Sequence, residues 1–195
     1  IDTRYLLKGG YKNESLQPFN EVLASETCKR LWFNHVEYTL ATYKDVVVSK
    51  CLCFITKDTE LIICHQIKVE MENMFILDYL IVNEDHYSNN FGIIRNVNTL
   101  KRLECVPIFD NRENLNIEYY DEEELYISGE GRFFYEVKSF NEIIKVVKAL
   151  KRINITALDD LPEYFDELLY NYQHLIKFSN TRINRLCIIL NRQID

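Results

Sequence analysis

The chain has 195 residues, a length typical of one domain or of one domain with an appendage. Its formal net charge of −7 argues against a general nucleic-acid-binding protein, because binding a phosphate backbone requires a basic face. No apolar run approaches the roughly 20 residues that a membrane helix requires. The 6 Cys include no C-x-x-C pair, which favours buried free thiols in a reducing compartment. We therefore expect a cytoplasmic protein, at most peripheral at membranes.

The first 45 residues predict three strands with one interruption. Residues 4–12 form the first candidate strand, which Gly9 and Gly10 interrupt, and residues 28–33 and 38–45 form the second and third. Residues 13–27 are interpreted as an insertion between the first two strands. A short helix after Pro18 is one possibility for this insertion, and a loop is the other.

The middle of the chain predicts an antiparallel meander. Residues 46–55, 60–69 and 74–82 are rich in β-branched and aromatic residues, and short polar turns separate them. A helix agrees poorly with so many β-branched neighbours.

Further strands are predicted after this meander, at residues 91–95, 100–109, 115–119, 125–128 and 132–137. Ser139 and Glu142 form a capping box, so an amphipathic helix is predicted to begin there and to reach Leu150.

Residues 154–195 predict helices beyond this β-rich region. Pro162 marks a helix start, and apolar residues recur at helical spacing on either side of residues 179–181. One kinked helix and a helical hairpin both agree with this pattern. The apolar stripes predict contact with a partner or with a second copy of the chain, or else packing on the chain's own core. The candidate contact residues are Leu168, Tyr172, Ile183 and Leu186.

Three segments match the opening strands of one known family: Lys8-Gly-Gly-Tyr11, Lys29-Arg-Leu-Trp-Phe33 and Leu40-Ala-Thr-Tyr-Lys-Asp45. Over residues 4–152 the chain resembles the pleckstrin-homology superfamily. The resemblance implies an α+β fold, mainly an antiparallel β sandwich or barrel that a C-terminal amphipathic helix closes. The predicted domains are 1–153, with the insertion at 13–27, and a helical extension at 154–195 that packs on it. The tryptophan expected in the closing helix is missing, since the chain's one Trp is Trp32.

No catalytic signature was recognised in the chain. The motifs H-E-x-x-H, G-x-S-x-G, G-x-G-x-x-G and the phosphate-binding P-loop are absent. Cys64 and His65 are adjacent in a predicted strand and would point to opposite faces, so they cannot form a dyad. The acidic run at residues 121–124 is interpreted as a solvated loop. We therefore predict no catalytic residue, cofactor or metal site.

The remaining candidates for binding are the basic residues Lys8, Lys12, Lys29 and Arg30. In phosphoinositide-binding members of the family, basic residues on the first two strands hold lipid phosphates. The leading hypothesis is a non-enzymatic protein–protein interaction module, part of a larger scaffold, trafficking or regulatory protein. The first alternative is a module that targets anionic lipid. The second is an enzyme with an unrecognised site.

Overall fold

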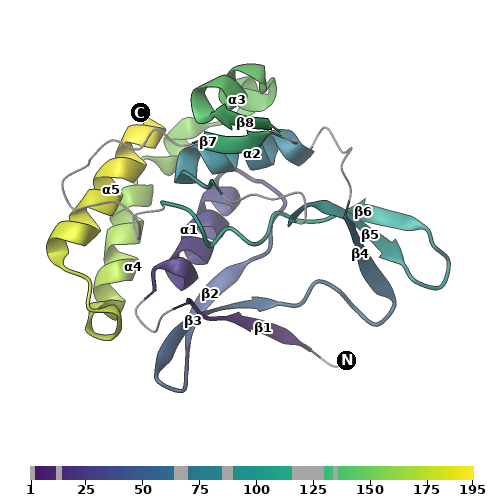
Figure 1. The fold of residues 1–195 in the computed structure, drawn as a ribbon, viewed down its shortest axis with the longest axis horizontal. Helices are drawn as coiled ribbons and strands as arrows, with labels where there is room; N and C mark the ends of the chain where they lie inside the picture. The colour runs from purple at the N-terminus through teal and green to yellow at the C-terminus, as the bar shows by residue number, and fades with distance from the viewer. Residues whose placement is uncertain (1–2, 12–14, 64–69, 85–89, 116–129, 134–135) are drawn as a thin grey trace.

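The computed structural model describes residues 3–11, 15–63, 70–84, 90–115, 130–133 and 136–195 (Figure 1). Short 3₁₀ turns at Ala149–Arg152 and Ile155–Leu158 accompany the longer elements. Those elements, in chain order, are β1 (Tyr5–Lys8), α1 (Gln17–Arg30), β2 (Tyr38–Tyr43), β3 (Val46–Leu52), β4 (Thr59–Ile63), α2 (Glu70–Ile81), β5 (Gly92–Asn96), β6 (Arg102–Cys105), β7 (Glu130–Phe133), β8 (Glu136–Ser139), α3 (Phe140–Val146), α4 (Leu161–Ile176) and α5 (Asn180–Ile194).

The strands form small separate sheets. One sheet has the order β1-β3-β2, a second has β4-β5-β6, and β7 pairs with β8, all antiparallel. The turn between β2 and β3 places Lys44 and Asp45 at φ 50° and 62°, the backbone of a two-residue hairpin turn. The α+β class is confirmed. A closed barrel is not, since the strands of the described residues make two three-stranded sheets and one pair.

The helix α1 lies at the centre of the molecule and contacts β2, β3, α2 and α4 (Figure 1). Pro18 lies in its first turn, and Lys29 and Arg30 lie in its last turn, where basic groups stabilise the helix dipole. The helix alternative for the segment after Pro18 is therefore confirmed, and the prediction of a strand at residues 28–33 is wrong, because residues 28–30 end this helix. Residues 17–25 of the helix are all buried, so its apolar residues show no single stripe there.

A second helix, α2, replaces the strand predicted at residues 74–82. Met74, Phe75, Ile76 and Leu77 are all at most 6% exposed, so the helix has no solvent face that polar residues would mark. A short apolar run of this kind cannot be assigned from periodicity alone, because a buried helix and a buried strand have the same pattern.

At the C-terminus the hairpin alternative is the observed one. Lys177 adopts φ 53° and ends α4, and the Ser179 hydroxyl accepts a hydrogen bond from the backbone N–H of Arg182 at 3.2 Å at the start of α5. The two helices pack together, and the core continues from them into α1 and α2.

Candidate functional site

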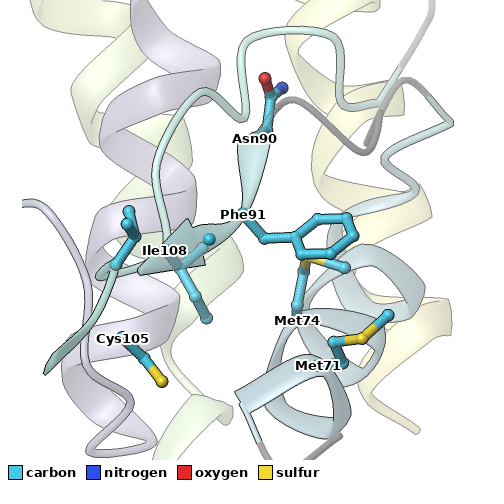
Figure 2. A pocket seen from close by; sticks show the side chains of 8 residues that line it. Met71, Met74, Asn90, Phe91, Cys105 and Ile108 are labelled. Atoms are coloured by element: carbon cyan, nitrogen blue, oxygen red, sulfur yellow. The ribbon is translucent and has the colours of Figure 1, made fainter. Parts of the chain in front are cut away.

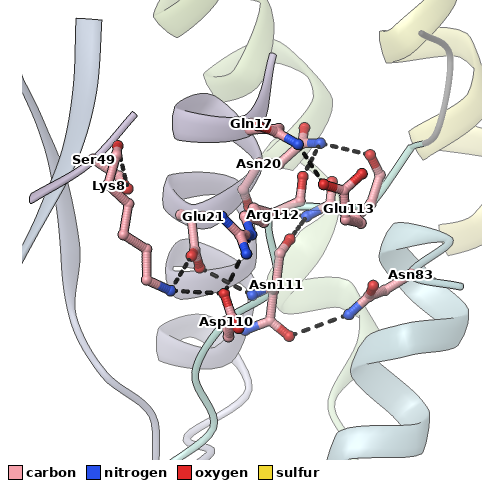
Figure 3. Close-up of polar contacts among 11 residues, drawn as sticks. Lys8, Gln17, Asn20, Glu21, Ser49, Asn83, Asp110, Asn111, Arg112 and Glu113 are labelled. Carbon is pink, nitrogen blue, oxygen red and sulfur yellow. Dashed lines mark hydrogen bonds and ion pairs between the residues drawn. The ribbon is translucent and has the colours of Figure 1, made fainter. Parts of the chain in front are cut away.

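Three charged side chains from distant parts of the sequence meet beside α1 (Figure 3). The Lys8 ammonium on β1 lies 2.6 Å from Glu21 Oε1 on α1 and 2.8 Å from Asp110 Oδ1, in the segment after β6. The Lys8 ammonium also lies 5.2 Å from the centre of the Tyr38 ring. Lys8 is therefore held by two carboxylates and one aromatic face.

The two carboxylates differ in their access to solvent. The Glu21 side chain is 1% exposed, and the Asp110 side chain is 25% exposed. Burial raises the pKa of Glu21, while the Lys8 ammonium and the backbone N–H of Asn111 oppose this rise. Because Lys8 donates to Oε1 of Glu21 and Asn111 to Oε2, Glu21 has both oxygens engaged inside the protein. Asp110 is the carboxylate that a ligand can reach.

The segment that carries Asp110 is anchored on two helices. The Asn111 backbone N–H donates to Glu21 Oε2 on α1 at 3.0 Å. The Asn83 side chain, just after α2, donates to Asp78 Oδ1 at 3.1 Å and to Asn111 Oδ1 at 3.4 Å. The end of α2 and the start of the 110–115 segment thus lie side by side, as Figure 3 shows for Asn83 and Asn111.

The residue Asn90 lies two residues before β5, five positions after Asp85 in the sequence. Asn90, Phe91 and Gly92 line a small cavity with Met71 and Met74 of α2 and with Ile108, as Figure 2 shows. Because Ile108 is two residues before Asp110, Asn90 belongs to the same region of the molecule as the charged cluster. Asp85 itself lies outside the described residues.

Sequence reasoning missed Glu21, Asp110 and the pair Asp85 and Asn90. For the last two residues the sequence does carry a recognisable spacing, D-x-x-x-x-N, from Asp85 to Asn90. The spacing is followed by a strand pair, β5 and β6, and then by Asp110. Glu21 carried no signal of its own, since it was interpreted as part of an acidic insertion.

The described residues contain no group of three or more His, Cys, Asp or Glu side chains that could hold a metal ion. Asp110 and Asn90 nonetheless offer a carboxylate and an amide oxygen, the hard ligands that Mg²⁺ accepts. Mg²⁺ is usually bound through one or two carboxylates together with substrate phosphates, so a dedicated protein cage is not required.

The four basic residues selected from the sequence do not form one cluster. Lys8 belongs to the charged cluster, and Lys12 lies outside the described residues. Lys29 is 63% exposed and lies 3.6 Å from Glu26, and Arg30 bonds Glu26 and Asp160 at 2.9 and 2.5 Å. Arg30 is nine residues beyond Glu21, roughly 13 Å along the helix axis. Anion binding at Lys29 and Arg30 stays a prediction.

The four apolar residues selected from the C-terminal stripes contribute to the chain's own core. Ile183 and Leu186 are 3% and 0% exposed, and Leu168 and Tyr172 pack against the core. The ring of Tyr172 also meets Phe19 of α1 edge to face, with 5.8 Å between centres. This placement agrees with the intramolecular alternative, while contact with a partner through α4 and α5 stays a prediction.

Comparison with known proteins identifies the fold. No protein-family model matches the chain, and the comparison with curated proteins gave no match. Among solved structures, 17 chains match. One is a Helicobacter pylori proinflammatory kinase, CtkA, with a TM-score of 0.67 and 17% sequence identity over 97% of this chain and 86% of that one. The chain thus shares its fold with a kinase.

This match corrects the interpretation from sequence. The resemblance to pleckstrin-homology domains is wrong, because the fold is that of CtkA and the matching segments include the end of a helix, at residues 28–30. The match with a kinase also contradicts the predicted non-enzymatic interaction module. Association with anionic lipid stays a prediction. Of the helices in the described part of the chain, none has the length and apolar character to cross a membrane.

Proposed function

We propose that the chain is a kinase core that transfers a phosphoryl group from a magnesium-bound nucleoside triphosphate to a hydroxyl group. The observation that carries the proposal is the contact of Lys8 with both Glu21 and Asp110. The fold shared with a kinase supports it independently of these residues.

The cluster has the parts that phosphoryl transfer requires. In protein kinases a strand Lys contacts the nucleotide phosphates and pairs with a Glu on a neighbouring helix, and an Asp further along the chain binds the metal. Here the Lys is on β1, the Glu is on α1 and the Asp follows β6. The Glu is the buried partner and the Asp is the accessible one, as these roles require.

Lys8 is suited to hold phosphate oxygens. An ammonium group has three N–H donors, and the contacts of the described residues account for two of them, to Glu21 and to Asp110. Glu21 fixes the Lys8 side chain on one side, so the ammonium is oriented before a nucleotide arrives. Preorientation of this kind avoids an entropy cost during the reaction.

Asp110 and Asn90 are the residues that would hold Mg²⁺. Bound Mg²⁺ would neutralise the charge that develops on the transferred phosphoryl group. Asp110 is close enough to Lys8 that the two would act on neighbouring phosphate oxygens.

Asp85 is the residue proposed to accept the proton of the substrate hydroxyl. This assignment rests on the spacing to Asn90 alone, since protein kinases place the base five positions before the metal-binding Asn. The acceptor could be a hydroxyl of a protein or of a small molecule.

Binding of trinitrophenyl-ATP, followed by fluorescence with Mg²⁺ present, tests the proposal. We expect saturable binding by the wild type and at least tenfold weaker binding by Lys8→Met. Lys29→Met is the matched control, because it removes an exposed lysine of α1 and should leave the affinity unchanged. Transfer of label from γ-labelled ATP should be lost in Asp85→Asn while binding persists. Failure of the wild type to bind millimolar nucleotide would refute the proposal.

A further inference from the structure

Two buried asparagines join the N-terminal part of α1 to the segment that carries Asp110. We infer that Asn20 and Asn114 are positioning residues: their reciprocal hydrogen bonds hold Asp110 beside Lys8, and so create the metal-dependent part of nucleotide binding. This inference rests on the proposed function.

The two side chains bond each other's backbone. Asn20 Nδ2 donates to the carbonyl of Asn114 at 2.6 Å and to that of Arg112 at 2.8 Å. Asn114 Nδ2 donates to the carbonyl of Asn20 at 2.9 Å and to that of Asn111 at 2.6 Å. We call these four bonds the asparagine clasp; three of them end on backbone carbonyls of the four residues that follow Asp110.

The clasp uses the N–H donors of the two amides and leaves their oxygens without a partner in the described part of the chain. Asn20 and Asn114 are 3% and 1% exposed, and both N–H groups of each amide are used. The amide oxygens of both residues are buried and lack a hydrogen-bond partner within the described part of the chain. Burying a polar atom without a hydrogen-bond partner costs free energy, so the four hydrogen bonds of the clasp must stabilise the fold by more than this cost.

The segment needs such support because it has little regular structure of its own. It lies outside the helices and strands, and Asp110 and Leu115 adopt φ 62° and 47°, which non-glycine residues rarely adopt. Strained backbone of this kind persists only where its surroundings determine it. The clasp supplies that constraint between the two positions.

The clasp and the charged cluster share one turn of α1. Glu21, next to Asn20, bonds Lys8 through one oxygen and the Asn111 N–H through the other. The two ends of the 110–114 segment are thus fixed to neighbouring residues of the same helix. Without the clasp, Asp110 would keep the attraction of Lys8 but would lose the fixed backbone that aims its carboxylate.

The test compares trinitrophenyl-ATP affinity in Mg²⁺ with affinity in EDTA, for Asn20→Ala, Asn114→Ala and the double variant. We expect the Mg²⁺ enhancement to fall at least tenfold in each single variant, while affinity in EDTA stays within about twofold of wild type. The double variant should lose no more of the Mg²⁺ enhancement than the more strongly affected single variant, because the clasp acts as one unit. Thr27→Val is the matched control: Thr27 is buried on the same helix, but its hydroxyl donates to the Leu23 carbonyl of α1 at 2.8 Å and not to the 110–114 segment.

Folding of each variant is checked by circular dichroism, and Ser replaces Ala at any position where Ala unfolds the protein. An unchanged Mg²⁺ enhancement, or an equal loss in Mg²⁺ and in EDTA, would show that the clasp is only structural and would overturn the inference while leaving the kinase proposal intact. A wild type that binds no nucleotide would overturn both.

Discussion

Replacing Glu21 with Gln tests whether the buried charge on α1 holds the site together. Both atoms that contact this carboxylate, Lys8 Nζ and Asn111 N, are donors, so the amide nitrogen of Gln would face a donor in either orientation. Removing one partner of a buried ion pair costs about 3–5 kcal/mol. Lys8 keeps Asp110 at 2.8 Å and is 16% exposed, so we expect the lower end, about 3 kcal/mol. For a chain of this length that corresponds to a fall in Tm of about 6–12 °C.

Thermal unfolding followed by circular dichroism, at neutral pH and without ligand, measures this fall. Glu26→Gln is the matched control on the same helix, since Glu26 pairs with Lys29 and Arg30 at the third and fourth positions along the helix. Helix pairs of this kind contribute less than about 1 kcal/mol. Equal shifts for the two variants, or no shift for Glu21→Gln, would refute the reasoning that Glu21 is a buried charge whose only role is to fix its two donors.

Three further predictions test local features. Trp32 is 93% exposed at φ 58°, so Trp32→Gly should raise the free energy of unfolding by about 0.5–1 kcal/mol in urea titrations, because glycine adopts this backbone without strain. A Cβ at Gly92 would lie 2.2 Å from the Ile62 carbonyl oxygen, so Gly92→Ala should lower stability by about 1–3 kcal/mol and weaken Mg²⁺-dependent nucleotide binding by displacing β5. Burial and the Asp166 carboxylate raise the pKa of the Cys187 thiol to about 12, so native protein at pH 8 should resist iodoacetamide at Cys187, and peptide mass spectrometry should detect full labelling only after denaturation.

The sequence predicted the elements whose local pattern matches their surroundings. Residues 38–45 and 46–55 alternate or carry β-branched runs on a small sheet, and β2 and β3 lie within these ranges. The helix starts at Ser139 and Pro162 were also predicted, because caps and proline act locally. The predicted meander is wrong in two respects. The strands β3 and β4 belong to different sheets, and residues 74–82 lie in and just after a helix, where burial removed the polar face that distinguishes a helix from a strand.

The charged cluster could be predicted from the sequence only in part. Lys8 was selected as a phosphate-binding candidate, a role that stays untested. Its partners Glu21 and Asp110 are 13 and 102 residues away, and only the fold brings them together. The D-x-x-x-x-N spacing at Asp85 and Asn90 was visible, but its meaning depends on an Asp that follows the next strand pair.

The buried polar residues of α1 explain why both this helix and the charged cluster were missed in the sequence. Gln17, Asn20 and Glu21 are each at most 4% exposed, and they disrupt the apolar pattern that would have identified a buried helix. Burying polar groups is costly unless every partner is supplied, so a helix selected for packing alone would carry apolar residues there. All three instead bond the segment at residues 110–114. The residues that made α1 hard to recognise in the sequence are therefore the ones that attach it to the segment of Asp110. Departures from the expected apolar pattern are typical of functional sites.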